Sequence, residues 1–362
     1  MLMETIMKHV SFKLLLVIIA GIHLLFISTY SFSQVDKTQD KEQKEKQKLA
    51  ALVKKGLDYL AKTQNSNGSW TCRVGYKLND SYLGEEYDNV GITAIAGIAF
   101  LAHGDTPGRG KYGANVEKAL RFVLSCFRET DGYITKHGTR MYEHGFAALF
   151  LSEVYGMSLR EDIKSKLKGS VQLIINSQTP EGGWRYQPSP IDADISVTVT
   201  ILQALRSARN VGIAVPKEVI DKATSYVKKS QNPTGSFNYQ LNVITRVSIP
   251  LAAAGVTSLM SAGEYDTPEV RKGIQYILDE LRRDPMPYGD YHFFYGHYYA
   301  VQAFFQAGGK NWERYFPPVR NEIIQNQQID GSWIDEVGEA YATAMATLIL
   351  QIPNDYLPIF QR

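Results

Sequence analysis

The sequence predicts an all-α protein in which six inner and six outer helices alternate along the chain and close into a ring. Three observations predict this fold: a glycine-containing turn that recurs, an amphipathic stretch before each turn, and an apolar stretch after it. The turn recurs with a period of roughly 50 residues, which is in the range of two-helix repeats. Six such units make residues 49–362 one domain of six repeats.

The recurring turn ends in an aromatic residue. Its glycine permits a backbone conformation that other residues avoid, and the aromatic ring is expected to pack between neighbouring helices. The clear copies are QNSNGSW (64–70), QTPEGGW (178–184), QNPTGSF (231–237) and QQIDGSW (327–333), and the weaker ones are RETDGY (128–133) and RRDPMPY (282–288).

Each turn follows a stretch whose apolar residues lie three or four positions apart, the spacing of one buried helix face. Ile163, Leu167, Val171 and Ile174 form such a stripe, with lysines between them. The sequence therefore predicts outer helices that bury one face and present the other to solvent. Two further stripes run from Leu49 to Leu60 and from Val270 to Leu281.

The stretch after each turn is apolar on nearly all sides and rich in alanine and glycine, as in helices that are buried over most of their surface. Six pairs of a half-exposed and a buried helix favour a closed ring. An open superhelix is the alternative, and it would need polar capping repeats at its ends. The apolar stretches cover residues 90–104, 144–156, 195–208, 247–263, 295–309 and 339–352.

The N-terminus has the features of a secretory signal. Lysines precede an apolar run over residues 14–27, which is shorter than a membrane span of about 20 residues, and a small-x-small serine pattern precedes Gln34. We expect a signal peptide over residues 1–33, a polar linker over 34–48, and a protein exported to the periplasm or the extracellular space. An uncleaved N-terminal anchor is the alternative.

Bulk composition excludes several classes of function. The net charge of +2 does not indicate a nucleic-acid partner. Cys72 and Cys126 make no zinc pattern; export permits a disulfide between them, and two buried thiols are the alternative. The chain has no nucleotide-binding loop, serine elbow or zinc-helix motif, so we expect no cofactor and no metal. The oligomeric state stays open.

The four clear turns resemble the glutamine–tryptophan repeats of the squalene cyclase and protein prenyltransferase superfamily, over about residues 46–352. The resemblance implies that the ring is an (α/α)6 toroid. The chain also resembles exported bacterial prenyltransferase and squalene-oxidase repeat proteins, a group of unassigned role. This resemblance implies an isoprenoid or other lipid ligand in a central cavity. It is carried by HGFAALFLSEVYGM, EGGWRYQP, DADISVTV, YGHYYAVQAFFQAGG and YLPIFQR.

Asp192 and Asp194 are the candidate catalytic residues, because Asp192-Ala193-Asp194 resembles the start of the Asp-x-Asp-Asp motif of class II terpenoid cyclases. The resemblance implies that Asp194 protonates an alkene or epoxide and that Asp192 orients its proton. Such an acid must be kept protonated by its surroundings. Ile195 replaces the last aspartate of the motif, which leaves catalysis open. The alternative role of Asp194, and of Asp88, is a helix N-cap.

His297 lies in a stretch that resembles the histidine-bearing segment of the zinc protein prenyltransferases. Neither cysteine stands at the start of an inner helix, and His292 and His297 are five positions apart, so they do not share a helix face as a ligand pair would. If the protein is an enzyme, we therefore expect acid-initiated terpenoid chemistry and not zinc-dependent prenyl transfer.

All inner helices of such a ring begin at the same end, so the polar side chains at their starts should surround one mouth. Glu143 and Glu339 as caps, and His144 as a buried histidine, are the alternatives. Phe294, Tyr298, Tyr299 and Phe305 are expected to line the cavity. The candidate substrate-binding residues are Asp88, Tyr142, Glu143, His144, Arg246, His292, Tyr295, His297, Glu339 and Tyr341.

Three functions are compatible with these patterns. The first is binding, with or without conversion, of an isoprenoid or other lipid, which allows peripheral contact with a membrane. The second is a non-catalytic exported binding or scaffold protein. The third is a polysaccharide lyase-like enzyme that uses Tyr142, His144 or Arg246 as base and charge neutraliser.

Overall fold

A computed structural model describes residues 43–73, 87–137, 140–241, 243 and 247–361. The chain divides into Met1–Ala51 and a compact unit, Leu52–Arg362, whose fold is described below. The expected signal peptide, residues 34–42 of the expected linker, and Arg246 lie outside the described residues. Within the described ranges, no helix is both long enough and apolar enough to cross a membrane.

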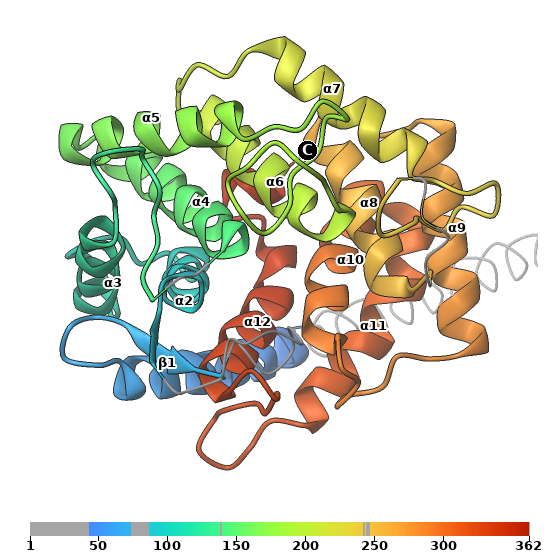
Figure 1. The fold of residues 1–362 in the computed structure, drawn as a ribbon. Helices are drawn as coiled ribbons and strands as arrows, with labels where there is room; N and C mark the ends of the chain where they lie inside the picture. The colour runs from blue at the N-terminus through green and yellow to red at the C-terminus, as the bar shows by residue number, and fades with distance from the viewer. Residues whose placement is uncertain (1–42, 74–86, 138–139, 242, 244–246, 362) are drawn as a thin grey trace, which may run out of the picture. The chain divides into compact units, whose positions relative to one another are not determined.

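Six helices form the inner layer of the compact unit (Figure 1). Each packs on the next in chain order, and α12 packs back on α2, so the ring is closed and is not an open superhelix. The predicted all-α toroid is confirmed. The inner helices are α2 (Val90–Ala102), α4 (Met141–Ser158), α6 (Ile195–Asn210), α8 (Ile249–Ser261), α10 (Phe293–Ala307) and α12 (Glu339–Gln351).

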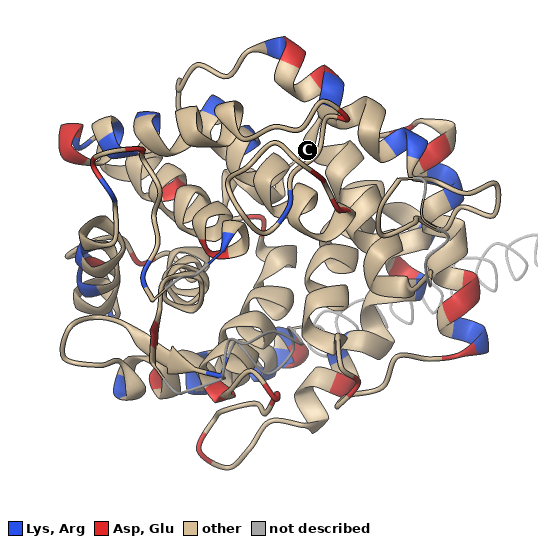
Figure 2. Ribbon diagram, in the orientation of Figure 1, with Lys and Arg blue, Asp and Glu red and all other residues tan. Residues whose placement is uncertain are grey.

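The outer helices alternate with the inner ones and bury one face. The stripe Ile163, Leu167, Val171 and Ile174 is buried, as predicted. Charged residues gather on the outer helices such as α7 and α9, and the inner helices carry few (Figure 2). The outer helices are a helix over residues 43–63, α3 (Gly113–Ser125), α5 (Glu161–Asn176), α7 (Lys217–Lys229), α9 (Pro268–Arg283) and α11 (Gly309–Gln325).

The end of the expected linker forms the start of the first outer helix. Residues 43–48 are helical, and their side chains are exposed. The glutamine, lysine and glutamate residues of this stretch have high helix propensity, so they extend the helix although they bury no apolar surface.

In three of the turns a tryptophan links an outer helix to the inner helix that follows it. The indole N–H of Trp184 donates to the Ile174 carbonyl at 2.8 Å, and that of Trp333 donates to the Ile323 carbonyl at 2.7 Å. The backbone N–H of Trp184 also donates to the Thr198 hydroxyl of α6 at 3.1 Å. The turn is therefore bonded to both helices that it connects.

The glutamine of each of the four clear turns joins one repeat to the next. The Gln178 amide donates to the Gly182 carbonyl of its own turn and to the Val219 carbonyl of the next outer helix, both at 2.8 Å. Gln327 of the last turn donates in the same way to the Leu52 carbonyl of the first outer helix, at 2.9 Å. The ring is thus closed by the same bond that joins consecutive repeats.

A short antiparallel sheet, which the all-α prediction did not include, precedes the first inner helix. β1 (Trp70–Cys72) pairs with β2 (Tyr87–Asn89), with Thr71 opposite Asp88. β2 leads directly into α2, so the sheet holds the first turn against the start of the inner layer.

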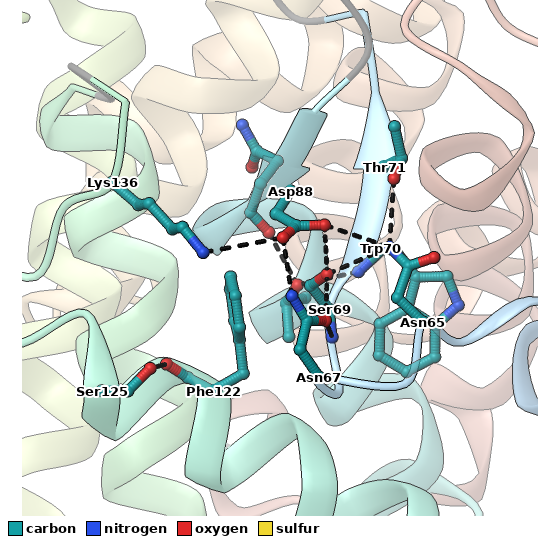
Figure 3. Close-up of polar contacts among 11 residues, drawn as sticks. Asn65, Asn67, Ser69, Trp70, Thr71, Asp88, Phe122, Ser125 and Lys136 are labelled. Atoms are coloured by element: carbon teal, nitrogen blue, oxygen red, sulfur yellow. Dashed lines mark hydrogen bonds and ion pairs between the residues drawn. The ribbon is translucent and has the colours of Figure 1, made fainter.

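The predicted N-cap role of Asp88 is wrong, because the cap of α2 is the next residue, Asn89. The Asn89 side chain caps α2 by accepting from the Ile92 N–H at 2.9 Å. The Asp88 carboxylate instead accepts from Asn67 and Ser69, each at 2.6 Å (Figure 3). Burial alone would raise the Asp88 pKa, but these hydrogen bonds and Lys136 at 3.6 Å lower it, so the carboxylate stabilises the first turn in its ionised form.

Cys72 and Cys126 are both buried and are not joined in a disulfide, so the alternative of buried thiols applies. Cys72 lies in β1, and Cys126 follows the last residue of α3. Burial raises the pKa of Cys126 to about 11. Its thiol therefore stays protonated and unreactive at neutral pH.

Candidate functional site

The mouth is the end of the ring at which all six inner helices begin, since each follows an outer helix that runs the opposite way. Half-exposed tyrosines gather there. Some lie in the first turn of inner helices, and the others lie in the turns that precede α6 and α8. These five, called the mouth tyrosines below, are Tyr142, Tyr186, Tyr239, Tyr295 and Tyr341.

Asp194 lies at the start of α6 and is completely buried. Its Oδ1 accepts from the Val197 N–H at 2.9 Å, so the predicted N-cap is confirmed. The same oxygen accepts from the Ser196 hydroxyl at 2.6 Å, and Oδ2 accepts from the Tyr239 hydroxyl at 3.3 Å. The Asp194 N–H donates to the Trp184 carbonyl at 3.0 Å, so the tryptophan turn positions the acid directly.

Burial raises the pKa of Asp194 to about 6, and the hydrogen bonds to its carboxylate only partly offset this effect. Arg185 Nε lies 3.9 Å from Oδ2 and is the nearby positive charge. A carboxyl group with this pKa is close to half protonated in a mildly acidic solution. It is therefore suited to act as a general acid.

Two chains of hydroxyl groups connect Asp194 to the mouth tyrosines. On one side, the Tyr142 hydroxyl donates to the Ser196 hydroxyl, which in turn donates to Asp194 Oδ1. On the other side, the Tyr239 and Tyr186 hydroxyls are 2.5 Å apart. Burial raises the pKa values of Tyr142 and Tyr239 far above the usual range, so these groups stay protonated and can donate hydrogen bonds.

Asp192 does not orient the Asp194 proton, contrary to the prediction. Its side chain is 50% exposed and is paired with Arg185. Asp194 enters the cap of α6, whereas Asp192 stays outside the helix. Arg185 neutralises Asp192 there.

Two histidines of the predicted set face the outer helices. The Ile134 N–H donates to His144 Nδ1 at 3.1 Å, and His144 Nε2 bonds to the Ser170 carbonyl of α5 at 3.2 Å. His297 Nδ1 bonds to the Tyr315 hydroxyl of α11 at 2.8 Å. Burial lowers both histidine pKa values to about 4, so these residues are neutral parts of the core.

The two predicted glutamates are structural as well. Glu143 accepts from the Arg140 N–H at 2.8 Å and helps to cap α4. Glu339 accepts from the Tyr59 hydroxyl, which belongs to the first outer helix. Asp88 belongs to the first turn, as described above. These three carboxylates therefore do not contact Asp194.

His292 and the predicted tyrosines lie at the mouth. The exposed His292 ring is 6.1 Å from the Tyr295 ring. The Tyr295 hydroxyl donates to the Ser196 carbonyl at 3.2 Å. The Tyr341 ring is 6.4 Å from Phe294. Tyr295 therefore connects α10 to the start of α6 beside Asp194.

Four residues of the site were missed in the sequence: Arg185, Tyr186, Ser196 and Tyr239. Tyr186 and Tyr239 each stand two positions after the aromatic residue of a turn, Trp184 or Phe237. This shared position in consecutive repeats was the available signal. In the part of the chain that the structure describes, no three His, Cys, Asp or Glu side chains come together as metal ligands would.

The pKa of Asp194 predicts an unusual dependence of stability on pH. An acid whose pKa is higher in the folded state binds more protons when folded, so stability falls as pH rises between the two pKa values. From about pH 4 to pH 6, the wild type should lose about 1–3 kcal/mol relative to Asp194→Asn. Urea unfolding across this range measures the difference, and Asp192→Asn is the control. Parallel profiles for the wild type and Asp194→Asn would contradict the raised pKa.

No model of a known protein family and no curated protein sequence matches the chain. Several solved structures share its fold. The type II terpene cyclase MstE from Scytonema has a TM-score of 0.59 and 13% identity, covering 86% of this chain and 98% of that one. Cellobiose 2-epimerase from Bacillus thermoamylovorans has a TM-score of 0.59 and 12% identity, covering 81% and 95%.

An α-1,6-mannanase of Salegentibacter, solved with α-1,6-mannotriose, has a TM-score of 0.58 and 8% identity, covering 84% of this chain and 98% of the mannanase. At these identities the similarity concerns the fold alone. Terpenoid and carbohydrate enzymes both have this fold, so it does not select between the two ligand classes. The chain is an (α/α)6 toroid with a buried acid at its mouth.

Proposed function

We propose that the protein is exported, binds an isoprenoid-type small molecule at the mouth and protonates it, with Asp194 as the source of the proton. The observation that carries the proposal is the buried Asp194 carboxyl group, whose pKa is raised to about 6 and which lies among the mouth tyrosines. The fold is compatible with this ligand class, since a variant of the terpene cyclase MstE was solved with its substrate, geranylgeranyl dihydroxybenzoate.

We assign the proton of the neutral Asp194 carboxyl group to Oδ2. Oδ1 already accepts from Ser196 and Val197, whereas the hydrogen bond at Oδ2 is the longer one to Tyr239, at 3.3 Å. When Oδ2 is protonated, it donates to the Tyr239 oxygen. Asp194 itself is completely buried, so a tyrosine hydroxyl must pass the proton on. The half-exposed Tyr239 and Tyr186 provide that path.

In the proposed step, the hydroxyl of Tyr186 or Tyr239 gives its proton to one carbon of a ligand C=C bond. A C–H bond forms, the π electron pair is used, and the other carbon becomes a tertiary cation. The tyrosine oxygen recovers a proton, directly or through the other tyrosine, from Asp194 Oδ2, which is left as the carboxylate. Ser196, Val197 and Arg185 stabilise that carboxylate, and the faces of the mouth tyrosines stabilise the cation.

The polysaccharide lyase alternative is disfavoured by its own residues. His144 is buried against an outer helix. Burial raises the pKa of Tyr142 well above its usual value, so Tyr142 stays protonated and is not available as a base. A non-catalytic binding protein would use the same mouth tyrosines, so only an experiment that detects conversion of the ligand distinguishes it from an enzyme.

The test is incubation of the purified protein with farnesol, followed by mass spectrometry. We expect conversion that weakens as pH rises above about 6, because Asp194 loses its proton. Asp194→Asn keeps the helix cap and should lower the rate by about 10²–10⁴-fold, whereas the exposed Asp192→Asn should not. Binding without conversion would leave a binding protein, and the absence of both would contradict the proposal.

A further inference from the structure

We propose that the mouth site ends about one helical turn inside the ring, at a floor formed by Phe146, Tyr298 and Tyr299, and that this floor restricts the buried part of an isoprenoid ligand to one end of its chain. The ligand class rests on the proposed function. The floor itself is inferred from contacts between side chains, and a test that uses no isoprenoid examines it separately.

The floor crosses the axis of the ring. α4 and α10 are three helices apart in a closed ring of six, so they stand on opposite sides. Nevertheless, the Phe146 ring of α4 and the Tyr298 ring of α10 contact each other, with centroids 6.0 Å apart. A chain that entered along the axis would meet these two rings.

Side chains of α6 and α10 also meet across the interior at this depth. The Thr200 and Tyr299 hydroxyls are 2.7 Å apart. One turn further in, the Gln203 amide donates to Gln302 at 2.5 Å. Thr200, Tyr298 and Tyr299 are 0% exposed, so no space large enough for water lies against them.

The first turn above the floor is more exposed than the floor. Tyr142 and Tyr295 are half-exposed, and each lies four residues before a floor residue on its helix, Phe146 or Tyr299. Four residues of helix correspond to about 6 Å. An isoprenoid of several units is longer than this depth, so only its end can enter.

The opposite end of the ring is covered by the C-terminal segment. After α12 the chain forms η2 (Ile352–Asn354) and η3 (Pro358–Phe360), and η3 packs on α6, the helix opposite α12. The Phe360 ring lies 6.5 Å from Tyr298, and Arg206 of α6 donates to the Gln361 carbonyl at 2.6 Å. The segment therefore crosses the ring beneath the floor.

Thiol labelling tests the floor without a ligand. Ser196→Cys and Thr200→Cys place nearly isosteric thiols one helical turn apart on α6, and the two buried native cysteines give the background. A water-soluble methanethiosulfonate should label Ser196→Cys at least tenfold faster than Thr200→Cys. Adding Phe146→Ala should remove most of that difference. Equal labelling of the two single variants would overturn the floor.

A chain-length series tests the restriction. Geraniol, farnesol and geranylgeraniol differ by one isoprene unit each, and calorimetry should show no gain in affinity with added units in the wild type. In Phe146→Ala the affinity should rise at least tenfold from geraniol to geranylgeraniol, and Phe146→Leu should show part of that rise if the alanine variant does not fold. Phe150→Ala is the matched control, because Phe150 packs against Gly97 of α2, away from the floor.

The two failures are distinguishable. If no isoprenoid binds but Thr200→Cys is protected, the proposed function is wrong and the floor stands. If the affinity of the wild type rises at least tenfold from geraniol to geranylgeraniol, or if Phe150→Ala changes the series as Phe146→Ala does, the restriction by the floor is overturned.

Discussion

Replacing Trp184 with alanine is expected to lower the free energy of unfolding by about 4 kcal/mol. The side chain is 1% exposed, and truncating a fully buried large aromatic residue typically costs about 3–5 kcal/mol. The variant also loses the indole bond to the Ile174 carbonyl at 2.8 Å. The Trp184 carbonyl accepts from the Asp194 N–H, so the turn lies directly against Asp194. Loss of the indole ring should let water reach the Asp194 carboxyl group, and its raised pKa should then decrease.

Denaturant unfolding measures the stability, and the pH profile of unfolding reports on Asp194. Trp312→Ala is the control, because it makes the same chemical change on α11, where the half-exposed ring stacks on Phe316. Its cost should be about 1–2 kcal/mol, since less area is buried. Equal losses in the two variants would show that the turn has no special role.

Replacing Gly331 with alanine should destabilise the protein by about 3 kcal/mol, because it acts where the last repeat meets the first. Gly331 has a φ of +96°, and an added Cβ would lie 2.5 Å from the Lys55 carbonyl oxygen. A left-handed conformation costs a non-glycine residue about 1 kcal/mol, and overpacking adds about 1–3 kcal/mol. The collision pushes the last turn away from the first outer helix.

Gly212→Ala separates these two costs. Gly212 has a φ of +81° and no atom within 4 Å of an added Cβ, so only the conformational cost of about 1 kcal/mol remains. Thermal unfolding should place Gly331→Ala well below Gly212→Ala. Similar unfolding temperatures for the two variants would contradict a close contact between the first and last repeats.

The fold was predictable because its cause is local and repeated. Gln178 and Trp184 make the same hydrogen bonds as their counterparts in other repeats. Each copy of the turn motif in the sequence therefore predicts a junction between an outer and an inner helix. The closed ring also placed Asp194 at the mouth, since a helix cap comes from the residue just before the first turn.

The rest of the site depends on contacts that sequence spacing does not determine. His297 lies on α10 near Tyr295, yet it faces Tyr315 of an outer helix because of how that short helix is rotated in the ring. Tyr239 reaches Asp194 from the following repeat. Asp88 lies one position before the cap residue of α2, and Asp192 lies two positions before that of α6. Because of these small offsets, Asp88 does not cap its helix and Asp192 does not orient the Asp194 proton.

The expected cavity lining also changed. Phe305 packs against Trp312 of an outer helix, with ring centroids 5.4 Å apart. Tyr298 and Tyr299 lie across the interior and close it. Helical periodicity identified these residues as apolar and inward, but it could not show how far side chains from opposite helices reach.

A crystal structure of the protein soaked with farnesol would show whether the mouth is the ligand site. We expect ligand density at the mouth, in contact with Tyr186, Tyr239 and Tyr295, with one end of the chain against Phe146. Density on the outer helices, or between the floor and the C-terminal segment, would contradict it.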